Sequence, residues 1–303
     1  MNIGTNLHGR LRNTSLPYSH GLLPLFEGVV NSIHALEEAD LASDKGWIQV
    51  AIDRAAVSRD LLDSNETEQE ARARGEIVGF TISDNGIGFN DENFEAFMTL
   101  DTDHKVAKGG RGIGRLLWLK AFDRAIIRSR FVDAAANLKE RSFTFGVTGV
   151  TGASVVTLDK SAERETTIRL VGFDKHYRAH SRKTGEAIAN AMLEHCLWYF
   201  VRVGGAPTIV IEDAGENIAL GELFDHHTHS LAVPEQARVK DRVLELLHVK
   251  LRASSSTVHA IAYCADNRLV LEESLRGESL VCTVNSPTKP ANSPTFVTSV
   301  LHS

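Results

Sequence analysis

The stretch LFEGVVNSIHA, residues 25–35, places Glu27 and Asn31 four positions apart inside an apolar run. Apolar residues recur on both sides of it at helical spacing, so the sequence predicts one helix over residues 21–40. Glu27 and Asn31 then lie one turn apart on the same face of that helix. A carboxylate and an amide oxygen in this arrangement can activate water and ligate a hard cation. An ordinary solvated polar stripe is the alternative that this stretch alone leaves open.

A second motif, ISDNGIGF over residues 82–89, follows the apolar run GEIVGFTIS, which predicts a strand. The strand would deliver Asp84 to its end, where the carboxylate can accept a hydrogen bond from an exocyclic amine such as that of adenine. Gly86 and Gly88 would let the backbone approach a flat ring without a Cβ clash. A hairpin turn of the Asp-Gly kind is the alternative for this motif alone.

A third motif, KGGRGIGR over residues 108–115, runs directly into the apolar segment LLWLKAF, which predicts a helix. Glycines and free backbone N–H groups at a helix start favour a bound phosphate, and Arg111 would add positive charge. The spacing of Gly110, Gly112 and Gly114 matches neither a dinucleotide-binding fingerprint nor a Walker loop. Residues 99–112, rich in small and charged residues, form a candidate lid; a plain surface loop is the alternative.

Together these motifs resemble those of the GHKL ATPases, which include gyrase subunits, the large heat-shock chaperone, histidine kinases and mismatch-repair ATPases. A fourth motif, ETTIRL over residues 165–170, completes the resemblance. The resemblance implies a Bergerat fold, which is an α+β, two-layer α/β sandwich with a mixed, mainly antiparallel sheet. It also implies ATP and Mg²⁺ as cofactors.

Each motif residue takes a role from this resemblance. Glu27 would be the general base, Asn31 a Mg²⁺ ligand and Asp84 the adenine reader. Thr167 would make a second adenine contact, and the glycine-rich loop would form the hinge of the lid over the triphosphate. The expected nucleotide-binding residues are Asn31, Asp84, Gly86, Gly88, Gly110, Arg111, Gly112, Ile113, Gly114 and Thr167. One departure concerns His34, which stands where many members carry aspartate; it would either donate a hydrogen bond there or pack.

We expect two domains. Residues 1–180 would form the ATP-binding domain, and residues 181–303 a smaller, transducer-like α/β region with a flexible tail from about residue 284. The run YCADNR and the strand-like segments around it carry the transducer resemblance. The Pro-, Ser- and Thr-rich tail also fits a truncated member of a longer family.

The resemblance predicts Mg²⁺-dependent hydrolysis of ATP, with lid closure coupled to homodimerisation or to a DNA or protein client. A DNA-associated or phage-defence role is an expectation by analogy. One alternative is a nucleotide-gated interaction module without turnover. Another is a histidine kinase core, which Glu27 disfavours because a base at that position favours water as the acceptor.

The composition fits an ATPase of the cytoplasm. The chain has 303 residues, 43% of them hydrophobic, and a net charge of −6, which is enough chain for two domains with cores. No apolar run is long enough for a membrane span, so no membrane partner is expected. Three cysteines at unequal spacing favour reduced thiols over a disulfide framework.

Overall fold

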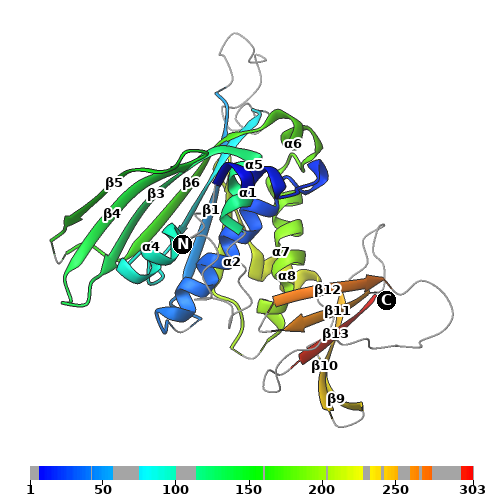
Figure 1. Cartoon of the computed structure of the whole chain (residues 1–303). Helices are drawn as coiled ribbons and strands as arrows, with labels where there is room; N and C mark the ends of the chain where they lie inside the picture. The colour runs from blue at the N-terminus through cyan, green and yellow to red at the C-terminus, as the bar shows by residue number, and fades with distance from the viewer. Residues whose placement is uncertain are drawn as a thin grey trace, which may run out of the picture.

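The computed structural model describes the chain in eleven segments, within which the fold is α+β. The described residues are 7–41, 43–56, 75–99, 114–159, 161–202, 204–227, 233–239, 242–251, 260–265, 268–274 and 295–302. An eight-stranded mixed sheet carries helices against one face, and a separate five-stranded sheet is formed by later residues (Figure 1). The α+β class and the mixed sheet are as expected, and the layering is compatible with an α/β sandwich.

Eight strands form the first sheet in the order β5-β4-β3-β6-β2-β1-β7-β8. Every neighbouring pair is antiparallel except β1 and β7, which are parallel. The predicted strand before Asp84 is β2, and the ETTIRL motif lies on its neighbour β6. The strands are β1 Trp47–Arg54, β2 Ile77–Asp84, β3 Phe122–Val132, β4 Leu138–Gly146, β5 Gly149–Thr157, β6 Glu165–Phe173, β7 Thr208–Asp213 and β8 Glu216–Ala219.

The helices of the described chain are short except α2 and α7, which lie next to each other. None of them is long and apolar enough to cross a membrane. The helices are α1 Leu7–Asn13, α2 Leu23–Glu38, α4 Asp91–Met98, α5 Gly114–Ala121, α6 Lys175–His180, α7 Gly185–Val201 and α8 Leu220–His227, with a 3-10 turn, η1, at Tyr18–His20.

Helix α2 is the centre of the helical layer because it is apolar on most sides. Leu25, Val29 and Ile33 are almost fully buried and recur at helical spacing, as the sequence predicts. They pack with Phe80 and Ile82 of β2, which are also fully buried. The close approach to β2 needs a glycine, since a Cβ on Gly28 would lie 2.4 Å from the Ile82 side chain. This packing fixes α2 against the sheet directly before Asp84.

The first sheet continues past residue 180, where we expected the first domain to end. Strand β7 pairs in parallel with β1, and β8 pairs with β7. Helix α7 buries a wide apolar surface, since it contacts α2, β7 and α8. Strand pairing therefore continues the first sheet to residue 219, and α8 contacts α7, β7 and β8. On this basis the first structural unit extends to residue 227 and includes the helix and strand expected to open the second region.

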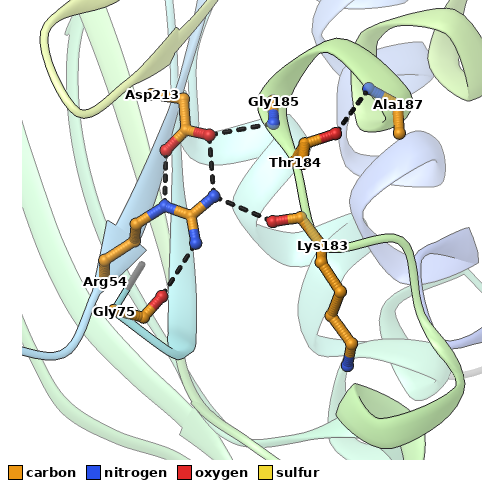
Figure 2. Close-up of polar contacts among 7 residues, drawn as sticks. All are labelled: Arg54, Gly75, Lys183, Thr184, Gly185, Ala187 and Asp213. Carbon is orange, nitrogen blue, oxygen red and sulfur yellow. Dashed lines mark hydrogen bonds and ion pairs between the residues drawn. The ribbon is translucent and has the colours of Figure 1, made fainter. Parts of the chain in front are cut away.

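An arginine–aspartate pair anchors the start of α7 to the sheet. Figure 2 shows the guanidinium of Arg54, at the end of β1, on the carboxylate of Asp213, at the end of β7, with N–O distances of 2.6 and 2.7 Å. The same guanidinium donates to the carbonyl oxygens of Gly75 and Lys183. Asp213 also accepts from the backbone N–H of Gly185, the first residue of α7. This bidentate pair therefore joins β1, β7 and α7 at one point.

The five-stranded sheet has the order β12-β11-β13-β10-β9. The strands expected around the YCADNR run are present as β10, β11 and β12. The last strand differs from the expected flexible tail, because it lies at the centre of the sheet, parallel to β10 and antiparallel to β11. The expected tail before it, residues 284–294, lies outside the described residues. The strands are β9 Val233–Val239, β10 Arg242–Leu251, β11 Ala260–Ala265, β12 Arg268–Ser274 and β13 Thr295–His302.

Candidate functional site

Helix α2 leaves one stripe of residues uncovered, and the two predicted polar residues are on it. Between Leu23 and Leu36, the only positions that are not buried are Leu23, Glu27, Asn31 and Ala35. They are spaced by four residues and so line up along the helix. Asn31 is exposed and Glu27 is half-buried. The structure therefore places both side chains on the least buried stripe of α2.

The loop after β2 packs against one end of this stripe. The backbone N–H of Ile87 donates to the carbonyl oxygen of Ala35 at 2.9 Å. A Cβ on Gly86 would lie 2.7 Å from the backbone of Ala35, so only glycine permits this approach. The predicted Asp84-x-Gly86 motif is thus bound to α2 one turn beyond Asn31.

Asp84 is 2% exposed and has a hydrogen bond to each carboxylate oxygen. Its Oδ2 accepts from the hydroxyl of Ser32 at 2.7 Å, and its Oδ1 accepts from the backbone N–H of Gly86 at 2.9 Å. Burial raises the pKa of Asp84 to about 6, although both hydrogen bonds favour the charged form and oppose the shift. Ser32 was missed from the sequence; a small polar residue on the apolar side of a predicted helix is the signal that could have identified it.

The threonine that shares a face with Asp84 is Thr166, whereas the sequence pointed to Thr167. In the pairing of β2 with β6, Asp84 is opposite Thr166 and Ser83 is opposite Thr167. Because neighbouring residues of a strand point to opposite faces, Thr167 lies on the face away from the helices, where its hydroxyl is 3.2 Å from that of Ser83. Thr166 is buried on the helical face with Asp84. Two consecutive threonines left this one-residue choice undetermined in the sequence.

Gly88 adopts a backbone that glycine alone tolerates well. Its φ angle is +75°, and a Cβ there would lie 2.6 Å from the Ser129 hydroxyl and 3.2 Å from that of Thr166. These two hydroxyls are 2.8 Å apart, and Ser129 also accepts from the backbone N–H of Phe89. Gly88 therefore brings the loop close to two hydroxyl groups on β3 and β6.

The start of α5 lies beside Glu27. A Cβ on Gly114 would be 3.3 Å from Oε2 of Glu27, which brings the end of the third motif next to the first. Gly110, Arg111, Gly112 and Ile113 lie outside the described residues, as does most of the candidate lid.

Arg115 joins the start of α5 to the end of α4. Its guanidinium donates to the carbonyl oxygens of Ala96 and Thr99, at 3.1 and 2.7 Å, and lies over the ring of Phe97. Arg115 is 9% exposed, and burial lowers its pKa. The backbone at residue 99 is thereby held next to residue 115.

His34 belongs to the packing between helices. It is 5% exposed, and its Nε2 lies 2.9 Å from the hydroxyl of Tyr199 on α7. Of the two possibilities for this residue, the structure supports packing with a hydrogen bond. The bond joins α2 to α7.

The amide oxygen of Asn31 suits a magnesium ion whose other ligands are phosphate oxygens and waters. Within the described residues, no group of three or more His, Cys, Asp or Glu side chains could hold a metal ion alone. Mg²⁺ in nucleotide sites uses one or two protein oxygens together with phosphate oxygens and waters. The amide oxygen of Asn31, which is exposed and one turn from Glu27, can supply such a ligand.

Comparison of the chain with protein-family models gives no match, and comparison with curated proteins gives none either. The resemblance to GHKL ATPases therefore rests on the four motifs themselves.

Proposed function

We propose that this protein binds ATP with Mg²⁺ beside the uncovered stripe of α2 and hydrolyses it to ADP and phosphate. The observation that carries the proposal is the meeting of segments that are far apart in the sequence. The stripe that holds Glu27 and Asn31 touches the loop of Asp84 at one end, through Ala35, and the start of α5 at the other, through Gly114. Carboxylate, amide and backbone groups of the kind that a nucleotide needs are thus grouped along one helix face.

Asp84 would select the base. Each of its oxygens accepts one hydrogen bond from the protein and retains a second lone pair. A carboxylate with free acceptor capacity prefers an amine donor, which adenine offers. Thr166, opposite Asp84 on β6, would contact the same base through its hydroxyl.

Glu27 and Asn31 would act on the phosphates. Glu27 is half-buried, and its carboxylate can accept a proton from a water that attacks the γ-phosphorus. Asn31 would hold Mg²⁺ through its amide oxygen. The ion offsets negative charge on the β- and γ-phosphates when it is bound. A lid, a homodimer and a DNA or protein client, including a phage-defence role, are expectations from the resemblance alone.

The decisive experiment is calorimetric titration of MgATP into the wild type, Asp84→Asn, Thr166→Val and Thr167→Val. In Asp84→Asn, the backbone N–H of Gly86 would hold the amide oxygen, and the NH₂ group would take the place of Oδ2 beside Ser32. The variant thereby loses one of the two acceptor oxygens that could receive the adenine amine. We expect about a tenfold or greater loss of affinity for Asp84→Asn and Thr166→Val, since tenfold corresponds to one lost hydrogen bond. Thr167→Val is the matched control and should bind as the wild type does. Equal affinity in all four proteins would refute the proposal.

Turnover is tested by phosphate release from the same samples. Glu27→Gln should retain MgATP binding and lose hydrolysis, because an amide cannot accept the proton. Asn31→Ala should lose the Mg²⁺-dependent part of binding and retain more of the Mg²⁺-free part. Binding without release in the wild type would instead favour a nucleotide-gated interaction module.

A further inference from the structure

Strand β5 forms one edge of the eight-stranded sheet and is exposed on both faces. It lies on the side of the molecule away from α7 and α8 (Figure 1). Every residue from Thr151 to Thr157 is exposed. Val155 and Val156, which point to opposite faces, are 46% and 52% exposed. Two adjacent valines are thus left in solvent at the end of the sheet.

The direction of the backbone groups on β5 follows from one hydrogen bond. The N–H of Leu158 donates to the carbonyl oxygen of Leu138 at 2.9 Å, so these residues form a hydrogen-bonded pair. In an antiparallel ladder such pairs alternate with pairs that are not bonded to each other. By the observed register, Ser154 and Val156 bond to β4, whereas Val155 and Thr157 direct their N–H and C=O groups away from it. Among the strands that the structure describes, none pairs with these outward groups.

The two edges of the sheet differ in how they are protected. At the opposite edge, β8 has four residues, begins with the charged Glu216 and runs directly into α8. Short length, charge and a covering element are usual ways to block edge pairing. Strand β5 has nine residues, GVTGASVVT, without a charged residue or a proline. A shift of register beside Gly152 disturbs its first half only, and the half that contains Val155 is regular.

We propose that β5 is the interface with a second copy of this chain, in which the two β5 strands pair antiparallel about a twofold axis. A twofold axis sets a strand antiparallel to itself, so the outward groups of Val155 and Thr157 meet equivalent groups of the other copy. The uncharged sequence brings no like charges together, and the valines of both copies shield each other on the two faces. The result is one continuous sheet. This interface is separate from the proposed ATP site and requires no nucleotide.

The first test measures the oligomeric state of the full chain, without nucleotide, by light scattering over a range of concentrations. Val155→Pro removes an outward N–H without removing a bond to β4, since proline is tolerated at the free side of an edge strand. Val155→Thr keeps the N–H and the branched side chain and is the matched control. We expect dimers for the wild type and Val155→Thr, and dissociation at a concentration at least about tenfold higher for Val155→Pro. Circular dichroism checks that all three are folded.

A monomeric wild type at every concentration, or equal dimerisation of Val155→Pro, would overturn the proposal. Hydrogen exchange resolved to single amides gives a second, mutation-free test. The amides of Ser154 and Val156 should be protected in monomer and dimer alike, whereas those of Val155 and Thr157 should be protected in the dimer only. Rapid exchange at Val155 and Thr157 in a dimer would show that the copies meet elsewhere.

Discussion

Asp84 is a carboxylate in a position that disfavours its charge. Burial raises its pKa to about 6 from an ordinary 3.8, against two hydrogen bonds that favour ionisation. At neutral pH the folded protein therefore keeps a poorly solvated negative charge at the end of β2. A ligand that donates a hydrogen bond to this carboxylate would compensate for part of that cost. The same property that makes Asp84 a good reader of an amine makes it a source of instability in the unliganded protein.

The stability of the unliganded protein should reflect this cost. Since the pKa of Asp84 is higher in the folded state, the folded protein binds more protons than the unfolded chain between about pH 4 and 6. The contribution of Asp84 to the free energy of unfolding therefore falls as the pH rises through this window and is constant above it. Asp84→Asn removes this dependence. We expect the variant to be more stable than the wild type at pH 7, by about 1–3 kcal/mol, and the difference to shrink towards pH 4.

Urea unfolding of both proteins from pH 4 to 8 measures this difference. Ser32→Ala provides a second variant, because it removes a hydrogen bond that favours the charged carboxylate; its pH dependence should be at least as large as that of the wild type. A wild type and an Asp84→Asn variant with parallel pH profiles would show that Asp84 titrates normally.

At the scale of elements, the sequence predicts where strands and helices occur better than it predicts which side of the sheet a side chain occupies. Alternating and helical apolar patterns correctly indicate α2 and the strands β1 to β6. The burial pattern of α2 also agrees with the prediction that Glu27 and Asn31 lie one turn apart on the same face of the helix. The choice between Thr166 and Thr167 depends on the register of β6 against β2, which a local pattern does not encode. His34 is similar, since its partner Tyr199 is 165 residues away.

The pair of Arg54 and Asp213 is an element-scale contact whose loss should be costly. Their side chains are 8% and 10% exposed, so Arg54→Met would leave a nearly buried carboxylate without its counterion. We expect a loss of about 3 kcal/mol in the free energy of unfolding, measured with urea. Arg130→Met is the matched control, because Arg130 pairs with Glu140 and Glu165 at a more exposed site and should cost under about 1 kcal/mol. Similar costs for the two variants would mean that the Arg54 pair does not join β1, β7 and α7 as inferred.

At the scale of the whole molecule, the position of the first unit's end could not be predicted. The local patterns of α7 and β7 are correct as helix and strand, but nothing in them says which sheet they join. Parallel pairing of β7 with β1 links residues about 160 positions apart. The one signal was the highly apolar sequence of α7, which indicates a helix with more than one buried neighbour. The central place of β13 in the second sheet has no such signal, because its pairing is again with distant strands.

This architecture predicts where the chain can be cut. A chain that ends at residue 180 lacks α7 and β7, so it exposes the side of α2 that carries His34 and leaves β1 as a sheet edge. The shorter chain also lacks the side chains of Ile188, Met192 and Cys196, which are all 0% exposed in the folded protein, so the residues that pack against them lose their cover. We expect it to aggregate or unfold without cooperativity, because fully burying one such side chain contributes about 1.5–3 kcal/mol. A chain that ends at residue 227 keeps all eight strands and should unfold in a single transition, as followed by circular dichroism and by the dispersion of amide signals in NMR spectra. Cooperative unfolding of the shorter chain would place the end of the first unit near residue 180 after all, and would make α7 and β7 an addition to a core that is already complete.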